Sequence, residues 1–219
     1  MFVPVLYDHH KFDINSIDYN FRRSIEMGEP LAKKLYYSKE EYLEMEAAAD
    51  YKSEYYQGEI FAMSGGSPKH SRICVNLNWA IREATRNKKD CGGFESNMKL
   101  EIAEADAYVY PDLMVVCGDV KLAENTTDVI TNPVLIIEVL SPGTESFDRG
   151  KKFEFYRTVK SLKEYILVSQ DKPKIETYFR KDRNSWEYTV IAGIEKTVVF
   201  RSLEYEVKLE EIYYKTELI

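Results

Sequence analysis

The chain has 219 residues, 44% of them hydrophobic and 31% charged, and its formal net charge at pH 7 is −7. A chain of this length and composition can bury a substantial core, so disordered and fibrous classes are excluded. The negative balance argues against a protein that coats nucleic acid with a broadly basic surface, because phosphate binding usually shows as clustered lysine and arginine. It does not exclude a local basic cleft.

The cysteines and the apolar runs indicate in which cellular compartment the protein is expected. Cys74, Cys91 and Cys117 are an odd number without Cys-x-x-Cys spacing, so we expect neither a disulfide framework nor a zinc knuckle. A reducing cytoplasm fits such a chain best. No apolar run approaches the ~20 residues of a membrane span, and residues 1–8 lack the features of a signal peptide. We therefore expect a cytoplasmic protein with no membrane partner.

The first part of the chain combines an irregular segment with a helix signal. Residues 1–35 show no clear period and are interpreted as an N-terminal extension, which leaves 36–219 as one domain. Ser38 and Glu41 match a capping box, so a helix is predicted from there to about Ala48.

A hairpin is predicted next, turning at Gln57-Gly58. Glu54 and Glu59 flank this turn, and the simplest interpretation of both is a solvated carboxylate on a hairpin.

A second helix is predicted from Pro68 to about Asn87, behind Ser67 as its N-cap. Its apolar stripe consists of Ile73, Leu77, Ala80, Ile81 and Ala84. His70 lies in its first turn, where a lone histidine more often caps or packs than reacts.

Two short β-branched runs, 109–116 and 133–140, are bounded by proline or glycine and predict buried strands. Residues 91–102 predict another strand, which should pair with 109–116 through a turn at 104–107.

Each of the two buried strands carries one carboxylate, Asp112 in the first and Glu138 in the second. A buried carboxylate is costly unless it is paired or binds a metal. Asp112 could cap its strand and Glu138 could pair with a buried cation, but together the two acids could also share a divalent ion.

A helix is predicted over residues 148–158, where Asp148, Lys152 and Tyr156 fall four residues apart on one face. The side chains on this face could point toward the two carboxylates, whereas Lys151 lies on a different face of the helix.

The remaining chain predicts a strand at 162–169, a meander of short strands over 173–207 and a helical turn at 209–214. The order helix, three strands, helix, strand predicts an α/β (α+β) fold with a mixed central sheet flanked by helices, and the crossover from Asp148 to Leu167 should be right-handed.

Several of these segments resemble a known family. Pro111-Asp112 followed by Ile137-Glu138-Val139-Leu140 resembles the core motif of the PD-(D/E)XK nuclease superfamily. The chain is also similar to the Uma family of putative restriction endonucleases over roughly residues 36–214. The segments that carry this likeness are Tyr56 to Ile60, Met63 to Pro68, His70, Val139 to Thr144, Asp148 to Phe153, and Tyr156-Arg157.

The resemblance implies a restriction-endonuclease-like core with extra hairpins and a C-terminal β-meander. At one position, however, this chain departs from the superfamily pattern. The superfamily places a lysine two residues after the strand glutamate, where this chain has Leu140. The Uma pattern carries a lysine on the following helix, which matches Lys152, so we expect the lysine to be relocated.

The resemblance further implies a metal-dependent endonuclease that acts on nucleic acid as a homodimer, with DNA favoured over RNA and double-stranded DNA as the expected partner. Asp112, Glu138 and the carbonyl of Val139 would hold Mg²⁺ or Mn²⁺, with Lys152 and His70 as further catalytic residues. Additional site residues of lower rank are Glu54, Glu59, Asp148 and Tyr156.

Two other functions stay open. The first is a nuclease-derived binding or accessory protein that no longer cuts, for which Leu140 is the best support. The second is a hydrolase of some other phosphate ester. If the two acids do lie together, at least one should have a raised pKa, because like charges repel.

Overall fold

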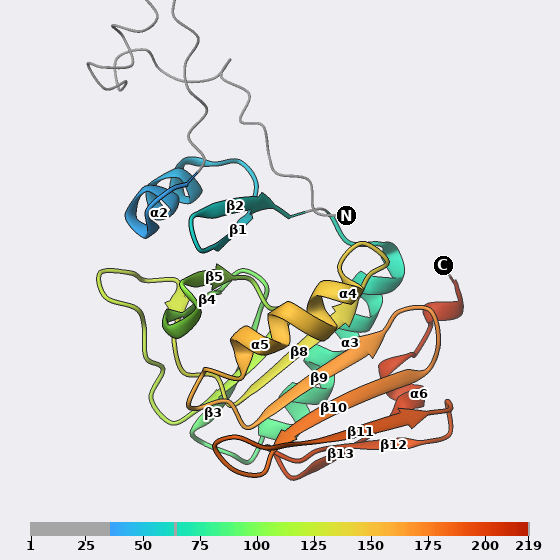
Figure 1. Ribbon diagram of the computed structural model, residues 1–219. Coiled ribbons are helices and arrows are strands. Elements are labelled where there is room, and N and C mark those ends of the chain that lie inside the picture. The colour runs from blue at the N-terminus through green and yellow to red at the C-terminus, as the bar shows by residue number, and fades with distance from the viewer. Residues whose placement is uncertain (1–35, 64, 219) are drawn as a thin grey trace, which may run out of the picture. The chain divides into compact units, whose positions relative to one another are not determined.

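The computed structural model describes residues 36–63 and 65–218 (Figure 1), which belong to two compact units with a boundary between residues 63 and 64. The predicted N-terminal extension, 1–35, lies outside the described residues.

The smaller unit contains one helix and one hairpin, as predicted. Helix α2 spans Lys39–Ala48, and strands β1 and β2 span Ser53–Tyr56 and Glu59–Ala62. The capping box is confirmed, because Ser38 Oγ accepts from the Glu41 amide at 3.2 Å and Glu41 Oε2 accepts from the Ser38 amide at 2.8 Å. Gln57 and Gly58 both have positive φ, which matches the right-handed twist of a two-residue hairpin.

Helix α3 opens the larger unit and spans Pro68–Thr85. Its N-cap is Ser67, whose hydroxyl accepts from the His70 amide at 3.1 Å, as the sequence predicts. All five residues of the predicted apolar stripe are buried.

The central sheet of the larger unit has six strands in the order β11-β10-β9-β8-β6-β3. Strands β8 and β9 run parallel and the other neighbours are antiparallel, so the predicted mixed sheet is confirmed. The strands are β3 (Cys91–Glu95), β6 (Leu113–Cys117), β8 (Leu135–Leu140), β9 (Glu164–Ser169), β10 (Lys174–Arg180) and β11 (Trp186–Ala192).

Two predicted strands are each divided in the structure. The 91–102 strand becomes β3 and β4 (Lys99–Ile102), and β4 pairs with β5 (Ala107–Val109) and β7 (Val129–Ile130) instead of joining the central sheet. A short 3-10 turn, Ala103–Ala105, links β4 to β5. The 109–116 run likewise breaks between β5 and β6, because Pro111 has no N–H for a sheet ladder.

The crossover from β8 to β9 contains a helical segment made of α4 (Glu145–Phe147), one π-helical turn (Asp148–Lys152) and α5 (Phe153–Tyr156). Figure 1 shows α4 and α5, in gold, on the face of β8 and β9 opposite to α3. Phe153 packs on the sheet, with its ring centroid 5.7 Å from that of Tyr165 and 4.3 Å from that of Tyr178. The crossover therefore lies directly over the face that carries Glu138.

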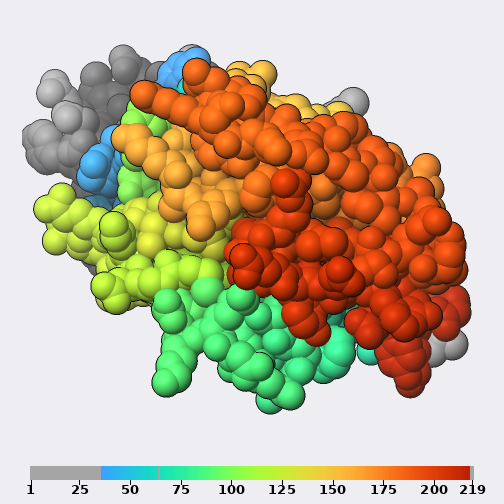
Figure 2. All heavy atoms as spheres, turned by 90° about the horizontal axis from the view of Figure 1, so that it is seen from below, coloured from blue at the N-terminus to red at the C-terminus, as the bar shows by residue number. Residues whose placement is uncertain are grey.

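The predicted C-terminal meander is only partly correct. Strands β10 and β11 extend the central sheet, whereas β12 (Thr197–Phe200) and β13 (Tyr205–Lys208) form a separate hairpin. Helix α6 (Leu209–Ile212) follows, with a 3-10 turn at Thr216–Leu218. Asn76 on α3 donates to the carbonyl of Ile212 at 2.9 Å, and Figure 2 shows the red C-terminal residues beside the green segment that contains the end of α3.

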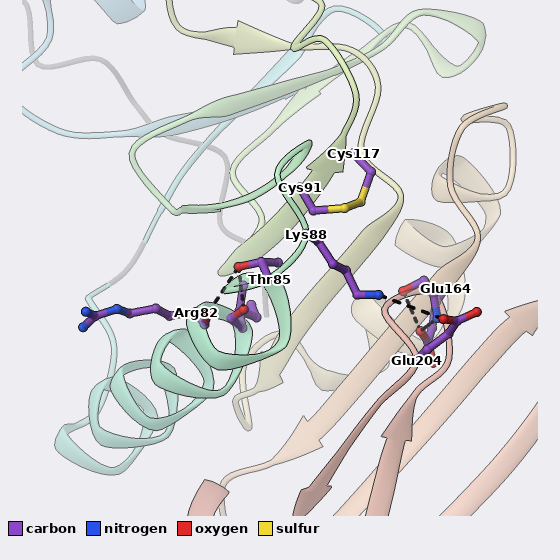
Figure 3. The surroundings of a disulfide bond; sticks show 9 residues. Arg82, Thr85, Lys88, Cys91, Cys117, Glu164 and Glu204 are labelled. Atoms are coloured by element: carbon purple, nitrogen blue, oxygen red, sulfur yellow. Dashed lines mark hydrogen bonds and ion pairs between the residues drawn. A yellow bond between two sulfur atoms is a disulfide. The ribbon is translucent and has the colours of Figure 1, made fainter.

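The expectation of no disulfide is wrong. Cys91 and Cys117 are directly opposite each other on β3 and β6, with Cα atoms 4.0 Å apart, and they form a disulfide (Figure 3). The odd cysteine count concealed this bond, because the pairing comes from strand register and leaves Cys74 as the free thiol. The cysteines therefore no longer indicate a reducing compartment.

None of the helices in residues 36–63 and 65–218 combines the length and the apolar character needed to cross a membrane.

Candidate active site

Asp112 and Glu138 come together where β6 begins beside β8. The two strands pair with Leu113 opposite Ile137, which sets the residue before Leu113 next to the residue after Ile137. The amide of Val139 donates to Asp112 Oδ2 at 2.8 Å, and the amide of Asp112 donates to Glu138 Oε2 at 3.2 Å. Each carboxylate therefore accepts a hydrogen bond from a backbone amide of the segment that carries the other carboxylate.

The helical crossover brings a lysine to this pair. Lys152 Nζ lies 2.8 Å from Glu138 Oε1, and the two side chains are only 7% and 5% exposed. Asp148 Oδ1 is 3.7 Å from the same nitrogen. A buried carboxylate next to a buried ammonium is the arrangement that offsets the cost of removing either charge from water.

Tyr156 completes the same face of the helical segment, because its hydroxyl donates to Glu138 Oε1 at 2.7 Å. Lys151 is exposed and lies 3.7 Å from Glu154. The inward orientation of Asp148, Lys152 and Tyr156 therefore agrees with the helical spacing, and the two neighbouring lysines face different ways.

The inward residues belong to, or follow, a π-helical turn, Asp148–Lys152. Such turns insert one residue into a helix and are found frequently at functional sites. Here the turn is supported from the sheet, since Tyr165 on β9 donates its hydroxyl to the carbonyl of Asp148 at 3.1 Å.

Burial raises the pKa of the Glu138 carboxyl above its ordinary value, and the charge of Lys152 opposes this shift. Asp112 and Asp148 add to it by like-charge repulsion. The expected raised pKa is therefore confirmed in direction, although desolvation is a larger cause than the neighbouring acids.

His70 reaches the site from the first turn of α3. Its Nε2 lies 3.1 Å from Asp112 Oδ2, and both side chains are 18% exposed. The hydrogen bond to Asp112, followed by that to Cys74, raises the pKa of His70 to about 10. At neutral pH the imidazole in this arrangement is protonated and positively charged.

The catalytic and metal-binding roles assigned from the sequence all stay predictions. Glu54 and Glu59 belong to the unit of residues 36–63. The interpretation as a solvated carboxylate is wrong for Glu54, which is buried and accepts from the hydroxyl of Tyr56 at 2.6 Å, whereas Glu59 is exposed as expected. For Val139 the structure describes the amide as a donor to Asp112, and the role of its carbonyl as a ligand is untested.

Cys74, which was not predicted as a site residue, lies beside His70, with its sulfur 3.6 Å from His70 Nδ1. The signal that could have found it is its position four residues after His70, on the same face of a well-predicted helix.

The carboxylates of Asp112 and Glu138 are hard oxygen donors on adjacent strands, and one of them retains some exposure. This donor set fits a small divalent cation such as Mg²⁺ or Mn²⁺, which prefers carboxylate and water oxygens.

The fold is that of a nuclease-like α+β protein. A crystal structure of a putative nuclease belonging to DUF820 from Anabaena variabilis has the same fold, with a TM-score of 0.67 over 81% of this chain and 97% of that one, at 18% identity.

Two relatives from Synechocystis sp. are closer in sequence. The uncharacterized protein sll1609 is 38% identical over 160 residues, covering 73% of this chain and 90% of the relative. The uncharacterized protein slr1290 is 39% identical over 149 residues, covering 68% and 77%.

The model of the Uma2 family, described as putative restriction endonuclease, matches residues 39–210. The chain belongs to this family, and the family supports a nuclease-like function.

Proposed function

We propose that this protein is a divalent-metal-dependent endonuclease that hydrolyses phosphodiester bonds, with double-stranded DNA as its preferred substrate. The observation that carries the proposal is the 2.8 Å contact between Lys152 Nζ and Glu138. It supports the view that Lys152, on the helix, stands in for the lysine that the superfamily carries at the position of Leu140.

In this proposal Asp112 and Glu138 hold Mg²⁺ or Mn²⁺, with the carbonyl of Val139 as a further ligand. When bound, the cation lowers the pKa of a coordinated water and offsets charge on the phosphate. The protein's own contribution is to hold these oxygens in place through the hydrogen bonds that Asp112 receives from Val139 and Glu138 receives from Tyr156.

Lys152 and His70 supply positive charge around the carboxylates. Lys152 is held between Glu138 and Asp148, so its ammonium is already oriented before a phosphate arrives. The raised pKa of His70 favours a protonated ring, which suits a contact with a phosphate oxygen better than the role of a general base. Both residues therefore act by stabilising negative charge.

Cutting a duplex requires hydrolysis on both strands, and each protomer contributes one cluster of Asp112, Glu138 and Lys152. We propose a homodimer for this reason. Specificity for a base sequence would come from loops that surround the site.

The proposal is tested by incubating the protein with supercoiled plasmid, single-stranded DNA, an RNA transcript and a small phosphodiester, with Mg²⁺ or Mn²⁺ or with a chelator. We expect the plasmid to be cut only when the cation is present. Asp112→Asn should lower the rate at least about a hundredfold, because it removes a charged ligand. Glu206→Gln changes an exposed carboxylate on β13 and is the matched control.

Cleavage by Asp112→Asn at the parental rate would show that the metal assignment is wrong. An accessory protein without nuclease activity remains the second candidate, favoured by Leu140 at the usual lysine position. It would bind nucleic acid with or without the cation and cut none of the substrates.

A further inference from the structure

Three different donor atoms converge beside the candidate active site. His70 and Cys74 are four residues apart on one face of α3, and Asp112 approaches them from the segment that precedes β6. One ligand atom from each residue lies within 4.8 Å of the others. The closest approaches are 3.1 Å from His70 Nε2 to Asp112 Oδ2 and 3.6 Å from His70 Nδ1 to Cys74 Sγ.

The chemistry of these donors differs from that of the Asp112 and Glu138 pair. A set of imidazole nitrogen, thiolate sulfur and carboxylate oxygen is typical of Zn²⁺ and of related borderline-soft cations such as Co²⁺. Mg²⁺ takes oxygen ligands almost exclusively and would gain little from Cys74. Two ligands at i and i+4 on one helix face are also a common way to present donors to a single metal ion.

The three side chains are accessible enough for a cation to enter and exchange. His70 and Asp112 are each 18% exposed, and Cys74 is half-buried. Cys74 is also available as a ligand, because the other two cysteines of the chain are joined to each other. The ordinary alternative is a histidine that only packs against the carboxylate, with the thiol as an incidental neighbour.

We propose that His70, Cys74 and Asp112 form a second cation site, selective for Zn²⁺ and similar borderline-soft ions, in which each residue gives one ligand and a water completes the coordination. In the structure Asp112 contacts Nε2 of the His70 ring and Cys74 contacts Nδ1. Because only one ring nitrogen binds the ion, the ring turns on binding so that this nitrogen faces the same ion as the thiolate and the carboxylate. The thiol proton and the proton shared between His70 and Asp112 are released to solvent.

The consequence for the enzyme comes from the shared residue. Asp112 Oδ2 already accepts from Val139 and lies next to His70, so a soft cation that takes this oxygen competes with the hard cation of the proposed nuclease site. Zn²⁺ should therefore inhibit by displacement. This consequence rests on the proposed function, but the existence of the second site does not.

The site is tested with Co²⁺ as a spectroscopic probe, in the absence of thiol reductants so that the disulfide stays intact. Binding to the full chain should produce a near-ultraviolet thiolate-to-cobalt charge-transfer band that saturates with one ion per chain. Because this chain has one free thiol, the band reports Cys74 alone. Cys74→Ser should abolish it.

Loss of even an outer-shell partner costs about 10–100-fold in metal affinity, so His70→Ala and Asp112→Asn should each weaken Co²⁺ binding at least as much. Val75→Ser changes a neighbouring residue that is 58% exposed and should leave the titration unchanged. Far-ultraviolet circular dichroism checks that each variant is folded.

Competition is measured separately. Zn²⁺ should displace Co²⁺ and remove the band, whereas Mg²⁺ at the same concentration should not. In the cleavage assay, the Zn²⁺ concentration that halves the rate should be higher for Cys74→Ser than for the parent. No thiolate band at saturating Co²⁺, or a band that persists in Cys74→Ser, would overturn the proposal. A band in a protein without cleavage activity would support the second site while counting against the proposed nuclease.

Discussion

Lys152 shows how a buried charge can be placed by packing. Its ammonium is enclosed by Glu138, Asp148 and the helical segment that carries it, and its side chain is 7% exposed. Lys151, its neighbour in sequence, is largely in solvent. The contrast between adjacent lysines offers a matched pair for mutation.

We expect Lys152→Ala to lower the cleavage rate by about 10²-fold or more, or ~3 kcal/mol in transition-state stabilisation, because it removes a preorganised charge. Lys151→Ala should have little effect. Single-turnover rates at saturating Mg²⁺ make the comparison, with circular dichroism as the control for folding. Equal rates for Lys152→Ala and the parent would exclude Lys152 from the site.

The position of Leu140 provides a second test of the same charge. Leu140 and Glu138 are two residues apart on β8, so their side chains lie on the same face of the sheet. Adding Leu140→Lys to Lys152→Ala should restore part of the cleavage rate if the ammonium alone matters. A double variant no faster than Lys152→Ala would show that the geometry of the helix is also required.

At the residue scale, the grouping of Asp148, Lys152 and Tyr156 was accessible from sequence, because helical periodicity places them on one face whatever the helix packs against. The partnership between His70 and Cys74 could have been found in the same way. Cys91 and Cys117 could not, since no local pattern relates them and only the register of β3 and β6 brings them together.

The packing of β3 against α3 depends on a glycine. A Cβ at Gly93 would lie 2.7 Å from Ile81 Cγ2, whereas a Cβ at Gly92 would have no atom within 4 Å. Ile81 is 2% exposed and belongs to the core cluster between helix and sheet, so it has little room to move.

Gly93→Ala should therefore destabilise the protein by about 1–3 kcal/mol, the usual cost of overpacking a core. Gly92→Ala should be neutral or slightly stabilising, because alanine loses less backbone entropy in a strand. Urea unfolding midpoints of the two variants measure the difference. If both substitutions lower the midpoint equally, the contact with Ile81 is not the cause.

At the element scale, the hairpin turn and the beginnings of the capped helices α2 and α3 were predicted well because caps and turns are set by neighbouring residues. The helical crossover, expected from Asp148, instead begins at Glu145, behind a residue whose side chain makes no cap hydrogen bond. Strand boundaries were predicted poorly at two places. The apolar pattern continues through 91–102 and through 109–116, but in each case the chain leaves one sheet and enters another. Hydrophobic periodicity does not report which sheet a strand joins.

For the whole molecule, the proposed metal site predicts a stability that depends on divalent cations. A cation that binds only the folded chain at 100 times its Kd stabilises by ~2.7 kcal/mol, which corresponds to roughly 5–10 °C in Tm for a chain of this size. Part of the gain comes from relief of repulsion between Asp112 and Glu138. Calorimetry with Mg²⁺ or Mn²⁺ measures the shift, and Asp112→Asn should largely lose it. An unchanged Tm would favour the accessory protein without nuclease activity.

The disulfide predicts a second property of the whole molecule. Cys91 and Cys117 are 26 residues apart, and closing a loop of this size typically contributes about 2–4 kcal/mol by restricting the unfolded chain. Dithiothreitol should lower the urea midpoint of the parent, whereas Cys91→Ser with Cys117→Ser should already be lowered and insensitive to reductant. A parent whose midpoint does not respond to complete reduction, verified by thiol counting, would contradict this expectation.

The sequence by itself determined the helix caps, the apolar stripe of α3, the inward face of the crossover and the family to which the chain belongs, because these depend on short-range patterns and ordered motifs. The tertiary structure alone decided that Lys152 reaches Glu138, that two runs are each divided between sheets, and that Cys91 meets Cys117. These features depend on strand pairing and register between segments far apart in the chain, and the free energy that selects a register comes from burying the whole core rather than from any local pattern.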